Sequence, residues 1–191
     1  MTLPDLLLPT CTQMLGTLSA WLGKAAARDT GDGAADGAAL LSTRLAPDMF
    51  PLSTQVRFAC VQALEGVARL RGEAFPAAIA VLIDEGRNAA GHPGSIADAQ
   101  ARIAETLAAL EAAAATMPDI DPAAPIAHSL PQGMIFDFTA GQYVRDWVIP
   151  QFYFHVMTAY AILRAQGVEL GKADYVAHLF GCLRPGTMPA A

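Results

Sequence analysis

The chain has 191 residues, a formal net charge of -6 and an isoelectric point near 5.0, and its Lys and Arg residues are scattered. This excludes the clustered basic patch that binds nucleic acid. Hydrophobic residues make up 53% of the chain and aromatic residues only 7%, since much of the apolar fraction is alanine. Alanine is the strongest helix former, so we expect one all-α domain, residues 1–191, with a full core.

Cysteine usage and the N-terminus give an expectation for the compartment. The three cysteines, Cys11, Cys60 and Cys182, form neither a CxxC motif nor an even disulfide framework, which favours a reducing compartment. The N-terminal MTLPDLLLPT lacks the basic region of a signal peptide, and no apolar run approaches the roughly 20 residues of a membrane span. We therefore expect a cytoplasmic protein that does not contact the membrane.

The first half of the chain predicts three amphipathic helices. Residues 5–28 carry apolar side chains at alternating steps of four and three, namely Leu7, Cys11, Met14, Leu18 and Trp21. A second helix begins after Pro51 and ends near Gly72, and a third begins at the N-cap Ser95 and ends before residue 118. The Gly/Asp-rich residues 28–43 are expected to be mobile, as are residues 182–191, and residues 73–94 fit either a short helix or an extended segment.

The second half predicts a hairpin followed by a long helix. Residues 126–138 alternate around a Pro-Gln-Gly break, which is typical of a small β-hairpin. A fourth helix should run from Thr139 to about Gln166 with a kink at Pro150, and a short final helix should cover residues 171–181. The predicted fold is therefore a four-helix bundle with a hairpin before its last long helix and a short C-terminal helix.

Three polar residues share one face of the otherwise apolar second half of the fourth helix. Gln151, His155 and Thr158 lie at i, i+4 and i+7, and the helix around them should be buried on most sides. In one interpretation these side chains form hydrogen bonds to a neighbouring helix, with Gln55 or Asp48 as the partner. In the other, they line a pocket.

The sequence contains none of the common motifs for metal binding, nucleophilic catalysis or nucleotide binding. The four histidines, His92, His128, His155 and His178, form no HxxxH or HxxH pair, and His92 and His128 are expected at the surface. No GxSxG, GxGxxG or P-loop occurs.

Two long motifs carry a resemblance to a known family. RLAPDMFPLSTQV (44–56) and FYFHVMTAYAILRAQGVELGK (152–172) resemble the bacterial family of the domain of unknown function 1993, within the DinB/YfiT-like superfamily of metalloenzymes. The resemblance spans most of the chain and is weakest at 73–94. It implies a four-helix bundle, commonly a homodimer. It also implies a zinc or nickel ion held by three histidines, one from helix two and an HxxxH pair from helix four, and in some members thiol-dependent transferase or isomerase activity.

The superfamily's three ligand positions can be matched to this chain. By its distance from the pair Leu163-Arg164, His155 takes the place of the second histidine of HxxxH, which puts Gln151 in the place of the first. The position in helix two falls on Phe58. Zinc and nickel sites depend on several nitrogen or sulfur donors, so we expect no cofactor and a degenerate triad in which only His155 could hold a divalent metal.

The sequence is compatible with three functions, and it does not decide whether the protein is an enzyme. The first is a small-molecule pocket between helices two and four, with His155 as general base or hydrogen-bond donor and Asp48 orienting it. Its further lining would come from Gln151, Thr158, Gln55, Phe50, Phe58, Trp147, Tyr153 and Tyr160. The second is a metal-dependent thiol transferase or hydrolase, and the third is a non-catalytic structural or stress-associated homodimer. Arg164 and Lys172 could hold an anionic substrate or remain solvated charges at the helix end.

Overall fold

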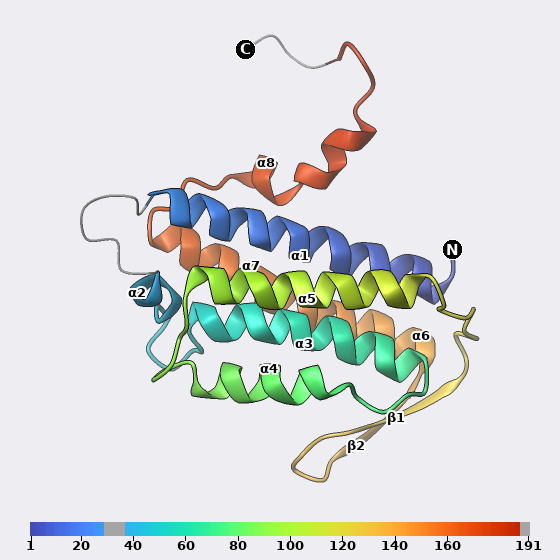
Figure 1. Cartoon of the computed structure of the whole chain (residues 1–191). Coiled ribbons are helices and arrows are strands. Elements are labelled where there is room, and N and C mark those ends of the chain that lie inside the picture. Colours follow the sequence, from blue (N-terminus) through green and yellow to red (C-terminus); the bar gives the residue numbers. More distant parts are fainter. Residues whose placement is uncertain (29–36, 188–191) are drawn as a thin grey trace.

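Four long helices form a bundle in this computed structural model, which describes residues 1–28 and 37–187 (Figure 1). They are α1 (Leu3–Arg28), α3 (Leu52–Leu70), α5 (Ile96–Ala114) and α7 (Ile149–Ala165). The helix α3 packs against α1, α5 and α7, and on its remaining side against α4 (Ala77–Asn88). The predicted all-α bundle is therefore confirmed. No helix among the described residues is both long and apolar enough to cross a membrane.

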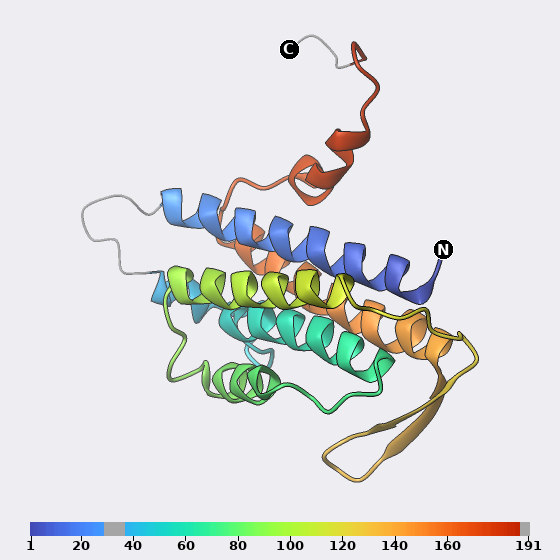
Figure 2. The ribbon, with the colours of Figure 1, turned by 45° about the vertical axis from the view of Figure 1, so that its right-hand side comes forward.

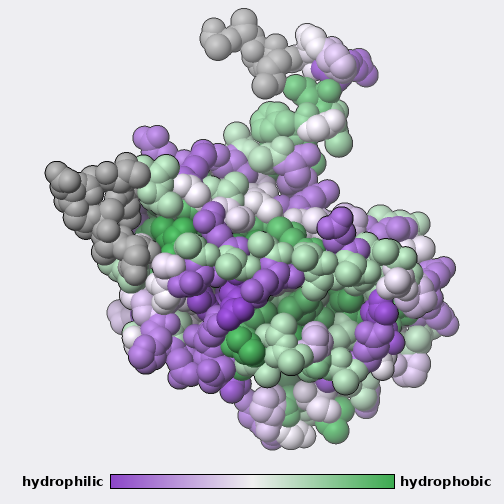
Figure 3. All heavy atoms as spheres, in the orientation of Figure 1, coloured by the Kyte–Doolittle hydropathy of each residue, from purple (hydrophilic) through white to green (hydrophobic). Residues whose placement is uncertain are grey.

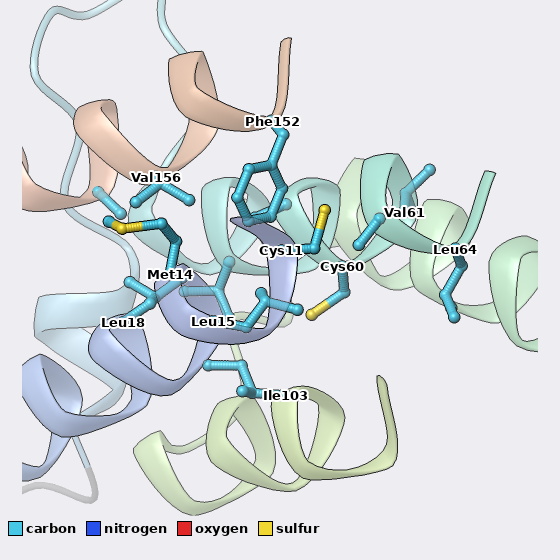
Figure 4. Close-up of a cluster of buried hydrophobic side chains, with 14 of the residues drawn as sticks. Cys11, Met14, Leu15, Leu18, Cys60, Val61, Leu64, Ile103, Phe152 and Val156 are labelled. Carbon is cyan, nitrogen blue, oxygen red and sulfur yellow. The ribbon is translucent and has the colours of Figure 1, made fainter. Parts of the chain in front are cut away.

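The core forms where the apolar faces of the four long helices meet. Every apolar residue predicted to face inward from the first helix is buried. Figure 4 shows Leu15 of α1, Cys60 of α3, Ile103 of α5 and Phe152 of α7 directed into one cluster. Burying one such side chain stabilises the fold by about 1.5–3 kcal/mol. The apolar faces that recur every 3.6 residues therefore favour packing of the four helices against one another.

The segment whose structure the sequence left open contains the helix α4. It begins after Pro76 and buries only Ile79, Leu82 and Gly86, which is too narrow a stripe for a clear periodicity. Polar contacts hold it against α3: Thr54 Oγ1 donates to the carbonyl of Gly86 (2.7 Å), and Arg57 Nε donates to Glu85 (2.9 Å). These contacts join residues about 30 positions apart, so local patterns could not indicate them.

The predicted hairpin is present, with β1 (Pro125–Ser129) and β2 (Ile135–Thr139) antiparallel and His128 opposite Phe136. The fourth helix differs from the single kinked helix predicted. It begins with α6 (Ala140–Gln142), continues as the π-helix η1 (Tyr143–Val148) and becomes regular only in α7. Pro150 has no N–H to bond the preceding turn, and the chain widens there, with the N–H of Ile149 bonded to the carbonyl of Val144.

The two segments expected to be mobile are only partly described. A short helix, α2 (Ala38–Leu41), lies inside the first; residues 29–36 and 188–191 lie outside the described residues. The predicted helix over 171–181 is instead α8 (Lys172–Tyr175) followed by the 3-10 helix η2 (Ala177–Cys182). Neither buries a residue. The short helix α8 lies against α1, where Tyr175 stacks on Trp21 at 6.2 Å and Lys24 pairs with Asp174, whereas η2 stands away from the bundle with hydrophobic residues on its surface (Figures 2 and 3). Because η2 has few contacts with the bundle, it lacks the packing that would extend a regular helix.

The close packing of α4 on α3 predicts the effect of one methyl group. A Cβ on Gly86 would lie 2.5 Å from Cε1 of Phe58, whose ring is held between its neighbours. We expect Gly86→Ala to reduce the free energy of unfolding by about 1–3 kcal/mol in urea denaturation, because the ring must shift. The matched control is Gly16→Ala in α1, where a Cβ meets nothing within 4 Å; it should be neutral or stabilising. Equal effects at the two positions would contradict the packing described.

Candidate functional site

The candidate site is built around a hydrogen bond between α7 and α3. His155 Nδ1 lies 2.9 Å from Gln55 Oε1, and Gln55 Nε2 donates to the carbonyl of Phe50 (3.1 Å). The second bond fixes which way the amide points. Since an amide oxygen can only accept, His155 carries its proton on Nδ1 and Nε2 has a free lone pair. Within the described part of the chain, no side chain forms a hydrogen bond with Nε2.

Burial decides the charge of this histidine. The side chain is 9% exposed, and desolvation lowers its pKa from 6.5 to about 4. At neutral pH the ring is therefore uncharged, and His155 presents a hydrogen-bond acceptor to whatever reaches Nε2. So low a pKa makes it a weak general base near pH 7.

Aromatic rings surround the histidine, and two of them, Phe50 and Phe154, are exposed to solvent. The rings of Phe58 and Phe154 meet the imidazole edge-on at 5.5 and 5.4 Å, and Phe50 lies 5.7 Å from Phe58. Phe50 is 49% and Phe154 57% exposed, and Met157 is exposed as well. This half of α7 is buried on most sides, as predicted, but one strip that carries Phe154 and Met157 is exposed. The bundle therefore leaves an apolar rim beside His155 uncovered.

The other polar residues predicted for the site have different surroundings. Thr158 Oγ1 donates to the carbonyl of Phe154 in its own helix (2.7 Å), so its hydroxyl proton is satisfied locally. Gln151 is half-buried and forms no hydrogen bond with the described residues. Asp48 is exposed and does not contact His155; of the two partners considered from the sequence, Gln55 is the one that the structure places there.

The predicted aromatic walls do not form one pocket. Phe50 and Phe58 lie beside His155, but Tyr160 packs against Trp21 of α1 at 5.2 Å. Tyr153, seven residues before Tyr160 and so on the same helical face, also points toward α1. Trp147 packs against His128 in the hairpin at 4.5 Å. The structure therefore places these side chains in three separate regions along η1 and α7.

The residues around His155 do not fit the metal that the resemblance implies. Zinc needs three or four donors, and the described residues contain no group of three His, Cys, Asp or Glu side chains that could hold an ion. His155 Nε2 is one donor, Gln151 a weak one and Phe58 none. Cys60 faces α5, with Sγ 3.9 Å from the carbonyl of Arg102, and burial raises its thiol pKa to about 11. Its thiolate is not available as a ligand.

Sequence reasoning missed a second group of polar residues at the other end of α3. Glu65 and Arg69 are spaced i and i+4, so they share one face of α3, and this charged pair in the largely apolar second half of the helix is the signal that could have revealed them. His128 was expected at the surface but is 4% exposed, because the hairpin packs it against Tyr143 and Trp147. The prediction for His128 is therefore wrong.

The sequence and the fold of this chain are similar to those of known proteins. The family model described as domain of unknown function (DUF1993) matches residues 3–176. The chain belongs to this family. A crystal structure of a DinB family member protein from Shewanella denitrificans is similar, with a TM-score of 0.69 and 35% sequence identity; the match covers 98% of this chain and 96% of that one. Curated proteins gave no match. The predicted membership of the DUF1993 family is thus confirmed, as is the DinB-like fold.

The low pKa of His155 predicts how the stability of this DUF1993 protein depends on pH. The folded pKa of about 4 lies below the unfolded value of 6.5, so the unfolded chain binds more protons between these values. Stability should fall as the pH drops from 6.5 to 4, by roughly 3 kcal/mol in total from this group. In urea denaturation across this range, His155→Phe should lose that part of the slope. His92→Phe, in an exposed loop, should keep the wild-type slope; identical slopes in all three proteins would contradict the burial argument.

Proposed function

We propose that this protein binds a small, largely apolar molecule with one hydrogen-bond donor at the rim around His155, without a metal ion. The observation that carries the proposal is the His155–Gln55 hydrogen bond of 2.9 Å, which commits Nδ1 and leaves Nε2 as an acceptor. The exposed rings of Phe50 and Phe154 supply apolar contact area beside it. Few polar groups within apolar surroundings are the usual form of a small-molecule site.

The electrostatics of the rim favour a neutral ligand that donates a hydrogen bond to Nε2 of His155. The imidazole is uncharged at neutral pH, so it neither attracts an anion nor repels a cation, and its free nitrogen can only accept. A phenol, an alcohol or an amide N–H matches this requirement. A metal-dependent transferase or hydrolase is less well supported, because a metal would need at least two further strong donors beside His155.

A matched pair of probes tests the proposal. In ¹⁹F NMR titrations, 4-fluorophenol should bind about tenfold more tightly than 4-fluoroanisole, which has a similar shape but no donor. His155→Phe keeps an aromatic ring and removes the acceptor, so the preference for the phenol should disappear. His92→Phe is the control that should retain it. Equal binding of the two probes to the wild-type protein would contradict the proposal.

The melting temperature tests the claim that the protein binds no zinc or nickel ion. Equimolar zinc or nickel chloride should leave the Tm unchanged, because a ligand stabilises a protein only by binding its folded state. A rise of several degrees that is lost in His155→Phe would favour the metal-dependent alternative instead.

A second candidate function is supported by the outward side of α7. Pro150, Phe154, Met157 and Ala161 recur at i, i+4, i+7 and i+11, the spacing of a helix–helix seam, and Phe154 and Met157 are exposed. This side would suit an interface between two copies of the chain. Light scattering distinguishes the two functions: under this candidate, Phe154→Lys converts a dimer to a monomer, and binding of 4-fluorophenol weakens as the protein concentration rises. A monomeric wild-type protein would contradict it.

A further inference from the structure

A second polar cluster lies roughly 15–20 Å along α3 from Gln55. We call it the hairpin cluster, and it consists of Glu65 and Arg69 of α3, Tyr143 and Trp147 of η1, and His128 of β1. The ring of His128 lies 4.5 Å from that of Trp147 and 5.4 Å from that of Tyr143. The charges of Glu65 and Arg69 both act on the Tyr143 hydroxyl, and that of Arg69 also acts on His128. The five side chains are therefore neighbours although they come from three elements.

Most of these side chains hold buried polar atoms without a partner. Tyr143 is fully buried and His128 is 4% exposed, yet neither Tyr143 Oη nor His128 Nδ1 forms a hydrogen bond with any described residue. The same holds for Trp147 Nε1 and Arg69 Nε. Buried polar atoms are nearly always bonded to protein, water or a ligand. A concentration of unpartnered atoms at one place, in the part of the chain that the structure describes, therefore indicates an occupant.

The unpartnered atoms define the chemistry of that occupant. An indole N–H and a guanidinium N–H can only donate, so both require an acceptor. Arg69 forms no hydrogen-bonded ion pair with the described residues; its Cζ lies 4.4 Å from the centre of the Phe75 ring, and its charge acts on the neighbouring Glu65 carboxylate. Its charge favours an anionic acceptor. Glu65 also forms no hydrogen bond or ion pair there, and it requires a donor.

We propose that the hairpin cluster binds a small organic carboxylate that also carries a hydroxyl or amino group. The carboxylate accepts hydrogen bonds from Arg69, Trp147 and Tyr143. The hydroxyl or amino group donates to Glu65. The site is separate from the rim around His155 and does not depend on the function proposed there.

The hairpin provides the cover of this site. Phe136 and Phe138 of β2 lie 5.4 and 5.9 Å from Trp147, so their rings face the hydrocarbon part of the ligand. The two strands pair only with each other in the described sheet, and a two-stranded hairpin is marginally stable alone. Its contact with Trp147 can therefore open to admit a small molecule.

The two tryptophans of the chain make a direct test possible. The ¹H–¹⁵N spectrum should show one indole signal from Trp147 and one from Trp21, and Trp147→Phe assigns them. At constant ionic strength, L-lactate and L-alanine should shift the Trp147 signal and saturate in the low millimolar range, while Trp21 stays unmoved. Propionate, which lacks the second group, should bind about fivefold more weakly.

Substitutions distinguish specific binding at the hairpin cluster from nonspecific attraction of the carboxylate to any arginine. Arg69→Gln should weaken binding about tenfold or more, and Tyr143→Phe, which keeps the ring, by about threefold. Arg145→Gln is the matched control, an exposed arginine of η1 paired with Asp146, and should leave the affinity unchanged. His155→Phe should also leave the affinity unchanged, because His155 belongs to the rim and not to the hairpin cluster.

The proposal is overturned if none of the acids shifts the Trp147 signal at about 20 mM. That result would mean that water alone fills the cluster. Equal losses in Arg145→Gln and Arg69→Gln overturn it as well.

Discussion

The helix α3 is enclosed by other helices, and the polar atoms that it buries need partners inside the bundle. In its first half this is achieved: Ser53 and Thr54 donate to the carbonyls of Pro93 and Gly86, Arg57 binds Glu85, and Gln55 joins His155 to the carbonyl of Phe50. These bonds fix α4 and α7 relative to α3.

In the second half of α3, buried polar atoms such as Arg69 Nε have no hydrogen-bond partner among the described residues. An unpaired buried group costs about 1–3 kcal/mol, so several together would be comparable with the whole stability of about 5–15 kcal/mol. The two candidate sites follow from this difference between the halves of one helix.

Among the described residues, His155 keeps one feature of a metal ligand, an orienting partner, but lacks the further donors that a metal needs. In a site built for zinc, a histidine uses one nitrogen for the metal and the other for an orienting partner. Here the orienting partner is present as Gln55, but Gln151 and Phe58 stand where the resemblance places the other two ligands. What remains is an oriented, neutral imidazole in apolar surroundings. That arrangement can recognise a donor without any metal, and the rim of Phe50 and Phe154 gives such a ligand a surface to cover.

Much of the fold could be predicted from the sequence, because the four long helices carry clear apolar periodicity and the hairpin has a clear break. The helix α4 could not, since it buries three residues and is held by bonds from Thr54 and Arg57. For the site, the alignment of Gln151, His155 and Thr158 on one face was visible, and Gln55 was one of two partners considered. The position of the aromatic residues was not predictable in this way, since whether Trp147 or Tyr160 faces α3, α1 or the hairpin depends on the packing of distant segments. His128 was missed for the same reason: an alternating strand pattern does not reveal what a hairpin packs against.

We infer that His155 is a neutral hydrogen-bond acceptor and not a metal ligand. Long-range ¹H–¹⁵N correlation NMR of the histidine rings tests it directly, with His155→Phe to assign the signal among the four histidines. We expect His155 to be protonated on Nδ1 alone at neutral pH, to titrate near pH 4 and not to respond to equimolar zinc. A proton on Nε2, a titration near 6.5 or a shift of the ring nitrogens on adding zinc would contradict it.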